Sequence, residues 1–492
     1  MKYILAMDQG TTSSRSVLFN IRGEVTDLEQ VEYPIFYPQP GWVEQKPEDI
    51  LWSQLQTAKT IIARNSLTEE NLISIGITNQ RETTILWDRA TGEPVYNAVV
   101  WQCRRSSRYC EEYKRLGLED TIHHKTGLYL DAYFSATKIK WILDNVQGLR
   151  SRCEKGEIAF GTVDSWLIYN LTGKHVTDYT NASRTLLFNI ETLSWDQDLL
   201  ELFGIPEAVL PGIEPSDGDF GRTRKEVLGL EVPITGVAGD QQASLFGQTC
   251  FDRGEVKNTY GTGCFMLMNT KDRIISGNGL ITTVGFAVKN KVDYCFEGSV
   301  FTGGAVIKWL RDNLKLISSA AESESIACSV EDTEGVYIVP AFSGLGAPYW
   351  DMYARGIIVG LTGKARREHI VRAALEAIAY QVKDVLDAME KEGGSINLLK
   401  IDGGASANDF LLQFQSDMLD KKIVRPKVLE TTALGAALIS GLGAGAYKDL
   451  DELKKLYSID RIFSSIISGE RRQKLYAGWQ RAVERAKLWE IE

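Results

Sequence analysis

The sequence predicts an α/β protein with two related lobes that face each other across a cleft. Three short, β-rich apolar segments end in an acidic residue beside glycine, and they span residues 3–10, 234–240 and 398–404. Each segment is expected to be a strand whose carboxyl end opens into a glycine turn. Because ligands bind outside the carboxyl ends of strands in open α/β sheets, these three corners are the predicted places for chemistry.

The two-lobe prediction rests on a repeated turn. A glycine–threonine turn occurs at residues 10–12 and again at residues 261–263, once on each side of a boundary near residue 250. With 492 residues, the chain is about three times as long as a typical domain, so it has room for two large lobes. We therefore expect one lobe at residues 1–248 and a second at residues 249–492.

Amphipathic helices are expected between these strands. Residues 369–392 place apolar side chains near a 3.6-residue period, and glycines follow at 393 and 394. Residues 433–447 are small and apolar, but this run is shorter than the roughly eighteen residues that a bilayer span needs. A buried helix is the predicted structure there, and no membrane span is expected.

Charge and cysteine content exclude several classes of function. The formal net charge is −10, and no strong basic patch interrupts it, so nucleic acid and anionic lipid are not expected partners. The seven cysteines include no CxxC pair, which fits neither a disulfide framework nor a zinc site. The apolar run at the N-terminus is too short for a signal peptide. We therefore expect reduced thiols and a cytoplasmic location.

The segment at residues 8–15 is typical of a phosphate-binding turn. Gly10 lets backbone amides approach an anion, while the hydroxyl groups that follow it and the guanidinium of Arg15 can donate to phosphate oxygens. Asp8 supplies the kind of oxygen that Mg²⁺ prefers. A polar hairpin turn is the alternative. The turn at residues 260–263 is a weaker signal, which fits a plain turn and a phosphate loop equally well.

Some well-known nucleotide-binding patterns do not occur in the sequence. It contains no GxxxxGK[ST] loop, no GxGxxG that opens a helix, and no HRD or DFG motif of protein kinases. If the chain binds ATP, it therefore binds it through another fold.

Six motifs together carry a family resemblance. In chain order they are DQGTTSSR, ITNQRETT, VVWQCRR, AGDQQASLFGQ, YGTGCF and DGGASAN. They resemble the FGGY carbohydrate kinase family, and within it the members that act on glycerol. Residues 133–145 and 356–376 are similar to two further signatures of that family. The resemblance spans residues 3–445.

The resemblance implies an α/β fold of two actin-like lobes around a deep central cleft. Glycerol would bind in the first lobe and ATP mainly in the second, with Mg²⁺ as cofactor, and the products would be sn-glycerol 3-phosphate and ADP. A homo-oligomer, either a dimer or a tetramer, is also expected.

The family pattern implies a role for each residue of the polyol site. Asp240 would be the general base for the glycerol hydroxyl, with Gln241 beside it, and Arg81 and Glu82 would hold two hydroxyls from opposite sides. Taken without the resemblance, Asp240 fits a helix N-cap equally well, and an adjacent Arg–Glu pair is usually a surface feature. The aromatic residues that would line the pocket are Trp101, Tyr133 and Phe265.

The pattern also implies a nucleotide site. The positions that match phosphate-binding residues are Thr11, Thr12, Ser13, Arg15 and Thr262. Gly404 and Asn408 match adenosine-binding positions, and Gly304 matches a glycine that lines the nucleotide cleft. Lys308 stands where bacterial members commonly have Gln, and it can still donate a hydrogen bond.

Three other functions remain open from the sequence. Another FGGY-type polyol or ketose kinase would keep the ATP motifs and differ at the substrate positions. A non-enzymatic actin-like filament or chaperone ATPase would share only the phosphate turns, and its ATP turnover would not depend on added glycerol. A nucleotide-gated binding module would not require Asp240 beside Gln241.

Overall fold

The first half of the chain is built on a five-stranded sheet. The structure, a computed structural model, describes residues 1–490. The strands in the order β13-β5-β1-β2-β3 are β13 (Ile234–Gly239), β5 (Leu72–Asn79), β1 (Tyr3–Gln9), β2 (Ser13–Asn20) and β3 (Val25–Glu32). β1, β2 and β3 form an antiparallel meander, whereas β5 and β13 run parallel to β1.

The second half contains a seven-stranded sheet of related design. Its strands in the order β16-β17-β15-β14-β20-β21-β22 are β16 (Ile281–Val288), β17 (Lys291–Val300), β15 (Cys264–Lys271), β14 (Val256–Tyr260), β20 (Leu398–Asp402), β21 (Lys422–Pro426) and β22 (Ile459–Phe463). β14, β15 and β17 are antiparallel neighbours, and β20 and β21 follow in parallel with β14. Each half thus has an antiparallel meander of three strands followed by two parallel strands, which confirms the prediction of two related lobes.

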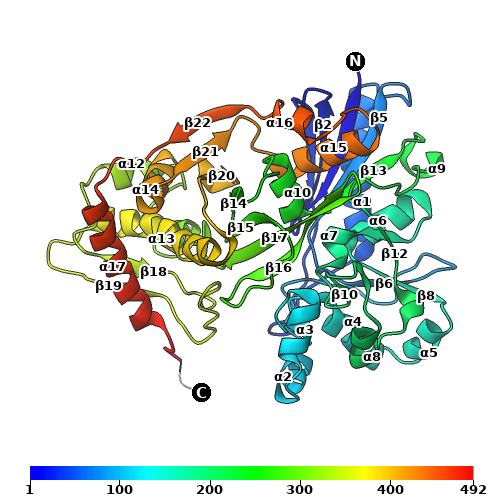
Figure 1. The fold of residues 1–492 in the computed structure, drawn as a ribbon, viewed down its shortest axis with the longest axis horizontal. Helices are drawn as coiled ribbons and strands as arrows, with labels where there is room; N and C mark the ends of the chain where they lie inside the picture. Colours follow the sequence, from blue (N-terminus) through cyan, green and yellow to red (C-terminus); the bar gives the residue numbers. More distant parts are fainter. Residues whose placement is uncertain (491–492) are drawn as a thin grey trace.

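Two helices form the layer between the sheets (Figure 1). α15 (Thr431–Gly443) packs on β1, β5 and β13, and α10 (Asp240–Gly247) packs on α15 and on β14, β15 and β16. The outer face of the first sheet carries α1 (Pro47–Arg64) and α6 (Val163–Thr172), and α13 (Arg367–Gly393) and α14 (Asp409–Leu419) cover the second sheet. The predicted boundary at residues 248/249 falls directly after α10. It stays a prediction, because α15 belongs to the second half of the chain and packs on the first sheet.

Apart from α17, the remaining α-helices and strands are short, and most of them belong to the first half of the chain. The other helices are α2 (Ser107–Arg115), α3 (Glu119–Thr126), α4 (Ser135–Asn145), α5 (Leu149–Glu154), α7 (Tyr179–Ala182), α8 (Gln197–Phe203), α9 (Lys225–Leu228), α11 (Ala305–Asp312), α12 (Glu322–Cys328), α16 (Leu450–Lys454) and α17 (Gly469–Ala486). The other strands are paired as β4 (Glu44–Gln45) with β7 (Ala98–Val99), β6 (Ile85–Asp88) with β8 (Ile158–Gly161), β9 (Val176–Asp178) with β12 (Gly212–Glu214), β10 (Phe188–Asn189) with β11 (Ser194–Trp195) and β18 (Tyr337–Val339) with β19 (Ile357–Val359).

The sequence-based expectations for individual elements are confirmed. The three segments that end in an acid beside glycine contain β1, β13 and β20. The amphipathic segment at residues 369–392 lies within α13, and the apolar segment at residues 433–447 overlaps the buried helix α15, which begins and ends earlier than expected. The cysteines are free thiols, and Cys328 alone among them is exposed. None of the helices within residues 1–490 combines the length and the apolar character needed to cross a membrane.

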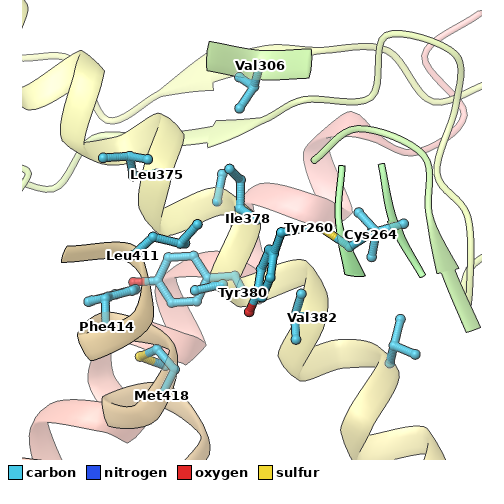
Figure 2. Packing of buried hydrophobic residues seen from close by; sticks show 14 of the residues in the cluster. Tyr260, Cys264, Val306, Leu375, Ile378, Tyr380, Val382, Leu411, Phe414 and Met418 are labelled. Carbon is cyan, nitrogen blue, oxygen red and sulfur yellow. The ribbon is translucent and has the colours of Figure 1, made fainter. Parts of the chain in front are cut away.

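The core of the second lobe supports the strands that lead into its glycine turn. Tyr260 at the end of β14 and Cys264 at the start of β15 are fully buried, and Figure 2 shows them beside Ile378, Tyr380 and Val382 of α13. The hydroxyl of Tyr260 also donates to Oε1 of Gln415 at 2.8 Å. The strands on both sides of the turn are therefore anchored in the core, while the turn residues Gly261 and Thr262 are exposed.

Glycines allow the backbones of the middle layer to approach closely. A Cβ atom at Gly435 of α15 would lie 1.7 Å from the carbonyl oxygen of Ala243 in α10, and one at Gly76 of β5 would lie 2.2 Å from the carbonyl oxygen of Ala436. Backbone atoms cannot move out of the way as a flexible side chain can. The position of α10, and with it the position of Asp240 at its first turn, therefore depends on these small residues.

Gly435→Ala is expected to force α10 and α15 apart. Overpacking of this kind costs about 1–3 kcal/mol, so thermal denaturation should show a clearly lower Tm together with a loss of activity. Gly469→Ala in α17 is the matched control, because a Cβ there meets no atom within 4 Å. Equal Tm values for the two variants would contradict the close-packing argument.

Candidate active site

Asp240 lies at the junction of β13 and α10. It is the first residue of the helix and follows Gly239, the N-cap. Its Oδ1 accepts from the backbone N–H of Gln241 at 2.7 Å and lies 3.1 Å from Nε of Arg81. The side chain is 31% exposed, and no hydrogen bond to Oδ2 is recorded within residues 1–490. Asp240 is therefore the first helical residue and not the N-cap, so the N-cap interpretation of the sequence is wrong, and its Oδ2 is a carboxylate oxygen without a hydrogen-bond partner in the described part of the chain.

Arg81 and Glu82 are buried in the loop between β5 and β6, so they are not a surface pair. A Cβ at Gly239 would lie 2.7 Å from the side chain of Arg81, so glycine is needed for this approach. Glu82 has φ of 61°, a left-handed backbone conformation that is unfavourable for a non-glycine residue. Its carbonyl oxygen accepts from the hydroxyl of Ser135 at 3.0 Å, which helps to hold this conformation.

Two charged residues of this site were missed at the sequence level. Arg184, which follows α7, is fully buried and its Nε donates to Glu82 at 2.7 Å, while its Nη2 donates to Glu297 of β17 at 2.9 Å. Burial disfavours the Glu297 carboxylate, but the guanidinium groups of Arg184 and Arg81 outweigh this effect and hold its pKa at about 2. The available signal was an acidic residue directly after the run Tyr294-Cys295-Phe296 of β17.

The aromatic residues connect the polyol candidates to the first turn. Trp101 and Tyr133 meet edge to face with ring centroids 5.6 Å apart, and the indole N–H of Trp101 donates to Oγ1 of Thr11 at 3.0 Å. The structure thereby brings three predicted residues together. Phe265 is half-buried on β15 just after the second turn, and within residues 1–490 it makes no recorded ring contact with the other two.

The first turn is the hairpin between β1 and β2. The N–H of Gly10 donates to the carbonyl oxygen of Ser13 at 3.0 Å, so the hairpin alternative is right in geometry and is compatible with phosphate binding. Thr12 is exposed, whereas the hydroxyl of the buried Ser13 already accepts from Gln30 at 3.0 Å. Ser13 is therefore less available to a ligand than its neighbours.

Asp8 and Arg15 lie opposite each other at this end of the sheet. Burial raises the pKa of Asp8 to about 6, Arg15 opposes this shift, and the negative charge of Asp240 adds to it. Two carboxylates that repel each other are a set of hard oxygen donors that suits a divalent cation. The chemistry of these side chains is compatible with a divalent cation, and Mg²⁺ binding at Asp8 stays a prediction.

The second turn is held against the start of α11. The carbonyl oxygen of Thr262 accepts from the N–H of Gly303 at 2.8 Å, and that of Gly261 accepts from Gly304 at 2.9 Å. A Cβ at Gly304 would lie 2.7 Å from the same Gly261 oxygen, so glycine is required for this contact. Lys308 is exposed one helical turn further on, where it can reach a ligand at the same edge.

The predicted adenosine residues follow β20. Gly404 is exposed with free space around its Cα. Asn408 has a structural role that the sequence analysis missed, because it is the N-cap of α14. Its side chain accepts from the N–H of Leu411 at 2.9 Å and donates to Ser323 at 3.3 Å.

Asp402, at the third predicted corner, has a structural role, whereas chemistry at this corner stays a prediction. Its buried Oδ2 accepts from Ser244 at 2.9 Å, Gln248 at 3.0 Å and Thr431 at 2.6 Å. These bonds connect β20 to α10 and α15, so Oδ2 of Asp402 helps to hold the layers together.

Lys257 is a further buried charge that was not predicted. Its ammonium group donates to Oε1 of Gln241 and, at 3.0 Å, to the hydroxyl of Thr259. Burial lowers its pKa, and the nearby carboxylates of Asp402 and Asp240 oppose this shift. Because an ammonium group only donates, the amide oxygen of Gln241 must face Lys257, which leaves the amide N–H groups for other partners.

Comparison with known proteins gives consistent matches over the whole chain. Residues 3–247 match the N-terminal domain and residues 256–444 the C-terminal domain of the FGGY family of carbohydrate kinases. A protein of Pseudothermotoga lettingae named glycerol kinase is 58% identical over 99% of both chains. The solved structure of Plasmodium falciparum glycerol kinase with ADP has 39% identity and a TM-score of 0.93, covering 99% of this chain and 98% of that one. Gluconate kinase from Lactobacillus acidophilus, at 23% identity and a TM-score of 0.89 over 98% of both chains, shares the fold.

The two roles of Asn408 can be separated by substitution. Asn408→Asp keeps an N-cap acceptor, so the Tm should hold, whereas Asn408→Ala should lose about 1 kcal/mol of stability. If the amide also contacts nucleotide, Asn408→Asp should raise the KM for ATP about three- to tenfold, as expected for one lost hydrogen bond. An unchanged KM in both variants would leave Asn408 with the capping role alone.

Proposed function

The chain belongs to the FGGY family of carbohydrate kinases, and we propose that it transfers the γ-phosphoryl group of ATP to glycerol, producing sn-glycerol 3-phosphate and ADP. The full-length identity to proteins named glycerol kinase supports this activity. The structural observation that carries the proposal is the contact between Asp240 and Arg81, because it places a carboxylate beside a buried group that can recognise hydroxyls.

Asp240 is the proposed general base. Its Oδ1 is held by the N–H of Gln241 and by Arg81, and its Oδ2 remains available to accept the proton of a hydroxyl group. As the hydroxyl oxygen attacks the γ-phosphorus in line, the carboxylate takes the proton, so no strongly basic alkoxide has to form in advance. Most of the catalysis then comes from positioning and charge stabilisation.

Arg81 and Glu82 are the proposed polyol-binding pair. A guanidinium only donates hydrogen bonds and an ionised carboxylate only accepts them, so the pair can satisfy two hydroxyls of one small molecule. The aromatic rings of Trp101 and Tyr133 can pack against the C–H groups of glycerol. Gln241, fixed by Lys257, and Phe265 complete the proposed site.

The two glycine turns are the proposed phosphate-binding elements. Thr11 and Thr12 in the first turn and Thr262 in the second present hydroxyl and amide groups, with Arg15 near the first. Asp8 would hold Mg²⁺, which when bound neutralises part of the phosphate charge. Gly304, Lys308, Gly404 and Asn408 are proposed to bind the rest of the nucleotide.

The rival functions explain fewer of the observed features. An actin-like ATPase without a small substrate has no use for Arg81 and Glu82 buried next to Asp240. Gluconate and xylulose kinases share the fold at 23% identity or less, which does not favour a sugar acid or ketose substrate. The deep cleft between the lobes, the homo-oligomer and the cytoplasmic location stay predictions.

ATP turnover is expected to depend on glycerol. In a coupled assay, glycerol should support turnover, whereas D-xylulose and gluconate should not, and 1-propanol should lose up to about 10⁴-fold in kcat/KM because buried Arg81 and Glu82 would be left unpaired. Equal kcat/KM for glycerol and 1-propanol would show that the polyol site is placed wrongly. ATP hydrolysis that is equally fast without glycerol would favour the actin-like ATPase.

Asp240→Asn is expected to lower kcat by about 10²–10⁴-fold. Asparagine keeps the shape and one acceptor oxygen, so ADP binding measured by calorimetry should be retained. Asp449→Asn is the matched control, because Asp449 also stands at a helix start, where it caps α16, and lies outside the proposed site. A kcat within tenfold of wild type for Asp240→Asn would end the assignment of the base.

A further inference from the structure

Glu297, a residue of the second sheet, hydrogen-bonds both buried arginines of the proposed polyol site. It lies in the middle of β17, its side chain has no exposed surface, and it accepts from Nη1 of Arg81 at 2.5 Å and Nη2 at 3.2 Å. Nη2 of Arg184 donates to the same carboxylate at 2.9 Å. A buried carboxylate is costly unless it is paired, and here two guanidinium groups pair it.

These contacts divide the nitrogen atoms of each arginine between different partners. Nε of Arg81 faces Asp240 at 3.1 Å, while both Nη atoms face Glu297. Nε of Arg184 faces Glu82 at 2.7 Å, and Nη2 faces Glu297. A guanidinium is a planar, rigid fork, so fixing one edge fixes the direction of the others. Glu297 therefore helps to set the orientation in which Arg81 meets Asp240 and Arg184 meets Glu82, and Gln242 supports it by accepting from Nη1 of Arg81 at 3.1 Å.

The arrangement leaves one donor without a protein partner. Nη1 of Arg184 is buried and has no hydrogen bond within residues 1–490. Buried donors are rarely unpaired in folded proteins, and this one belongs to a side chain bonded to Glu82 and lying 5.8 Å from the ring of Tyr133. Both neighbours are proposed polyol-binding residues, so this donor is available to a hydroxyl group in the proposed site.

We propose that Glu297 is a positioning residue for polyol selection, and that it acts by holding Arg81 and Arg184 in the orientation that hydrogen-bonds all three hydroxyls of glycerol. This inference rests on the proposed function. It adds two residues from distant parts of the chain to the substrate-determining set, one of them from the lobe assigned mainly to nucleotide. Selectivity should therefore depend on a residue that itself does not touch the substrate.

The test compares substrates, because a purely structural residue would affect them equally. The measured quantity is kcat/KM for glycerol divided by kcat/KM for 1,2-propanediol and for 1,3-propanediol, each of which lacks one hydroxyl. These ratios do not depend on the fraction of folded enzyme. Glu297→Gln places an amide N–H₂ against a guanidinium, so at least one ratio should fall about tenfold or more, as expected when hydrogen bonds to a charged group are lost.

Two further variants keep the result interpretable. Arg184→Lys retains the charge but not the fork, so it should lower the ratio in the same direction, and it decides the question if Glu297→Gln does not fold. Asp384→Asn is the matched control: it changes a buried carboxylate of α13 that accepts from Tyr476 at 2.6 Å and Trp479 at 2.8 Å, away from the proposed site. Its Tm should fall while both ratios stay at the wild-type value.

The outcomes separate this inference from the proposed function. Ratios within about twofold of wild type in either folded variant would overturn the positioning role while the activity on glycerol stands. A wild-type enzyme with no glycerol-dependent turnover would overturn the proposed function, and this inference with it. Lowered ratios in both variants, with unchanged ratios in Asp384→Asn, are the expected result.

Discussion

The site depends on one shared guanidinium group. Arg81 contacts Asp240 with its Nε and Glu297 with its two Nη atoms, so one side chain joins the base-bearing end of α10 to the second sheet. Burying this group is possible only because both carboxylates pair it. The position of the proposed base and the orientation of the proposed polyol-binding pair thus depend on the same ion pairs.

The close packing of α10 and α15 fixes the position of Asp240 beside Arg81. This packing requires glycine at specific positions of the middle layer. Gly435 and Gly76 let α10, α15 and β5 approach to distances at which any side chain would collide with backbone. Asp402 then ties the layers together through three hydrogen bonds. An acidic residue at the end of a strand thus has two different uses in this protein: the proposed chemistry at Asp240 and a structural role at Asp402.

Much of this could be predicted from the sequence, because it depends on local patterns. The apolar segments before Asp8 and Asp240 are strands, and residues 369–392 lie in a helix with the expected period. Glu297 and Arg184 were missed because their partners are 216 and 102 residues away in the chain, and no local pattern records such a pairing. The different use of Asp402 was also invisible, since only its neighbours in space distinguish it from Asp240.

The most direct test of this account is a crystal structure of the protein with glycerol and ADP. The account predicts glycerol within hydrogen-bond distance of Arg81 and Glu82, with one terminal hydroxyl facing Oδ2 of Asp240 and the ADP phosphates at the turn that contains Thr262. Glu297 should keep both arginines in the positions described above. Glycerol bound elsewhere, or bound with Asp240 turned away from every hydroxyl, would contradict it.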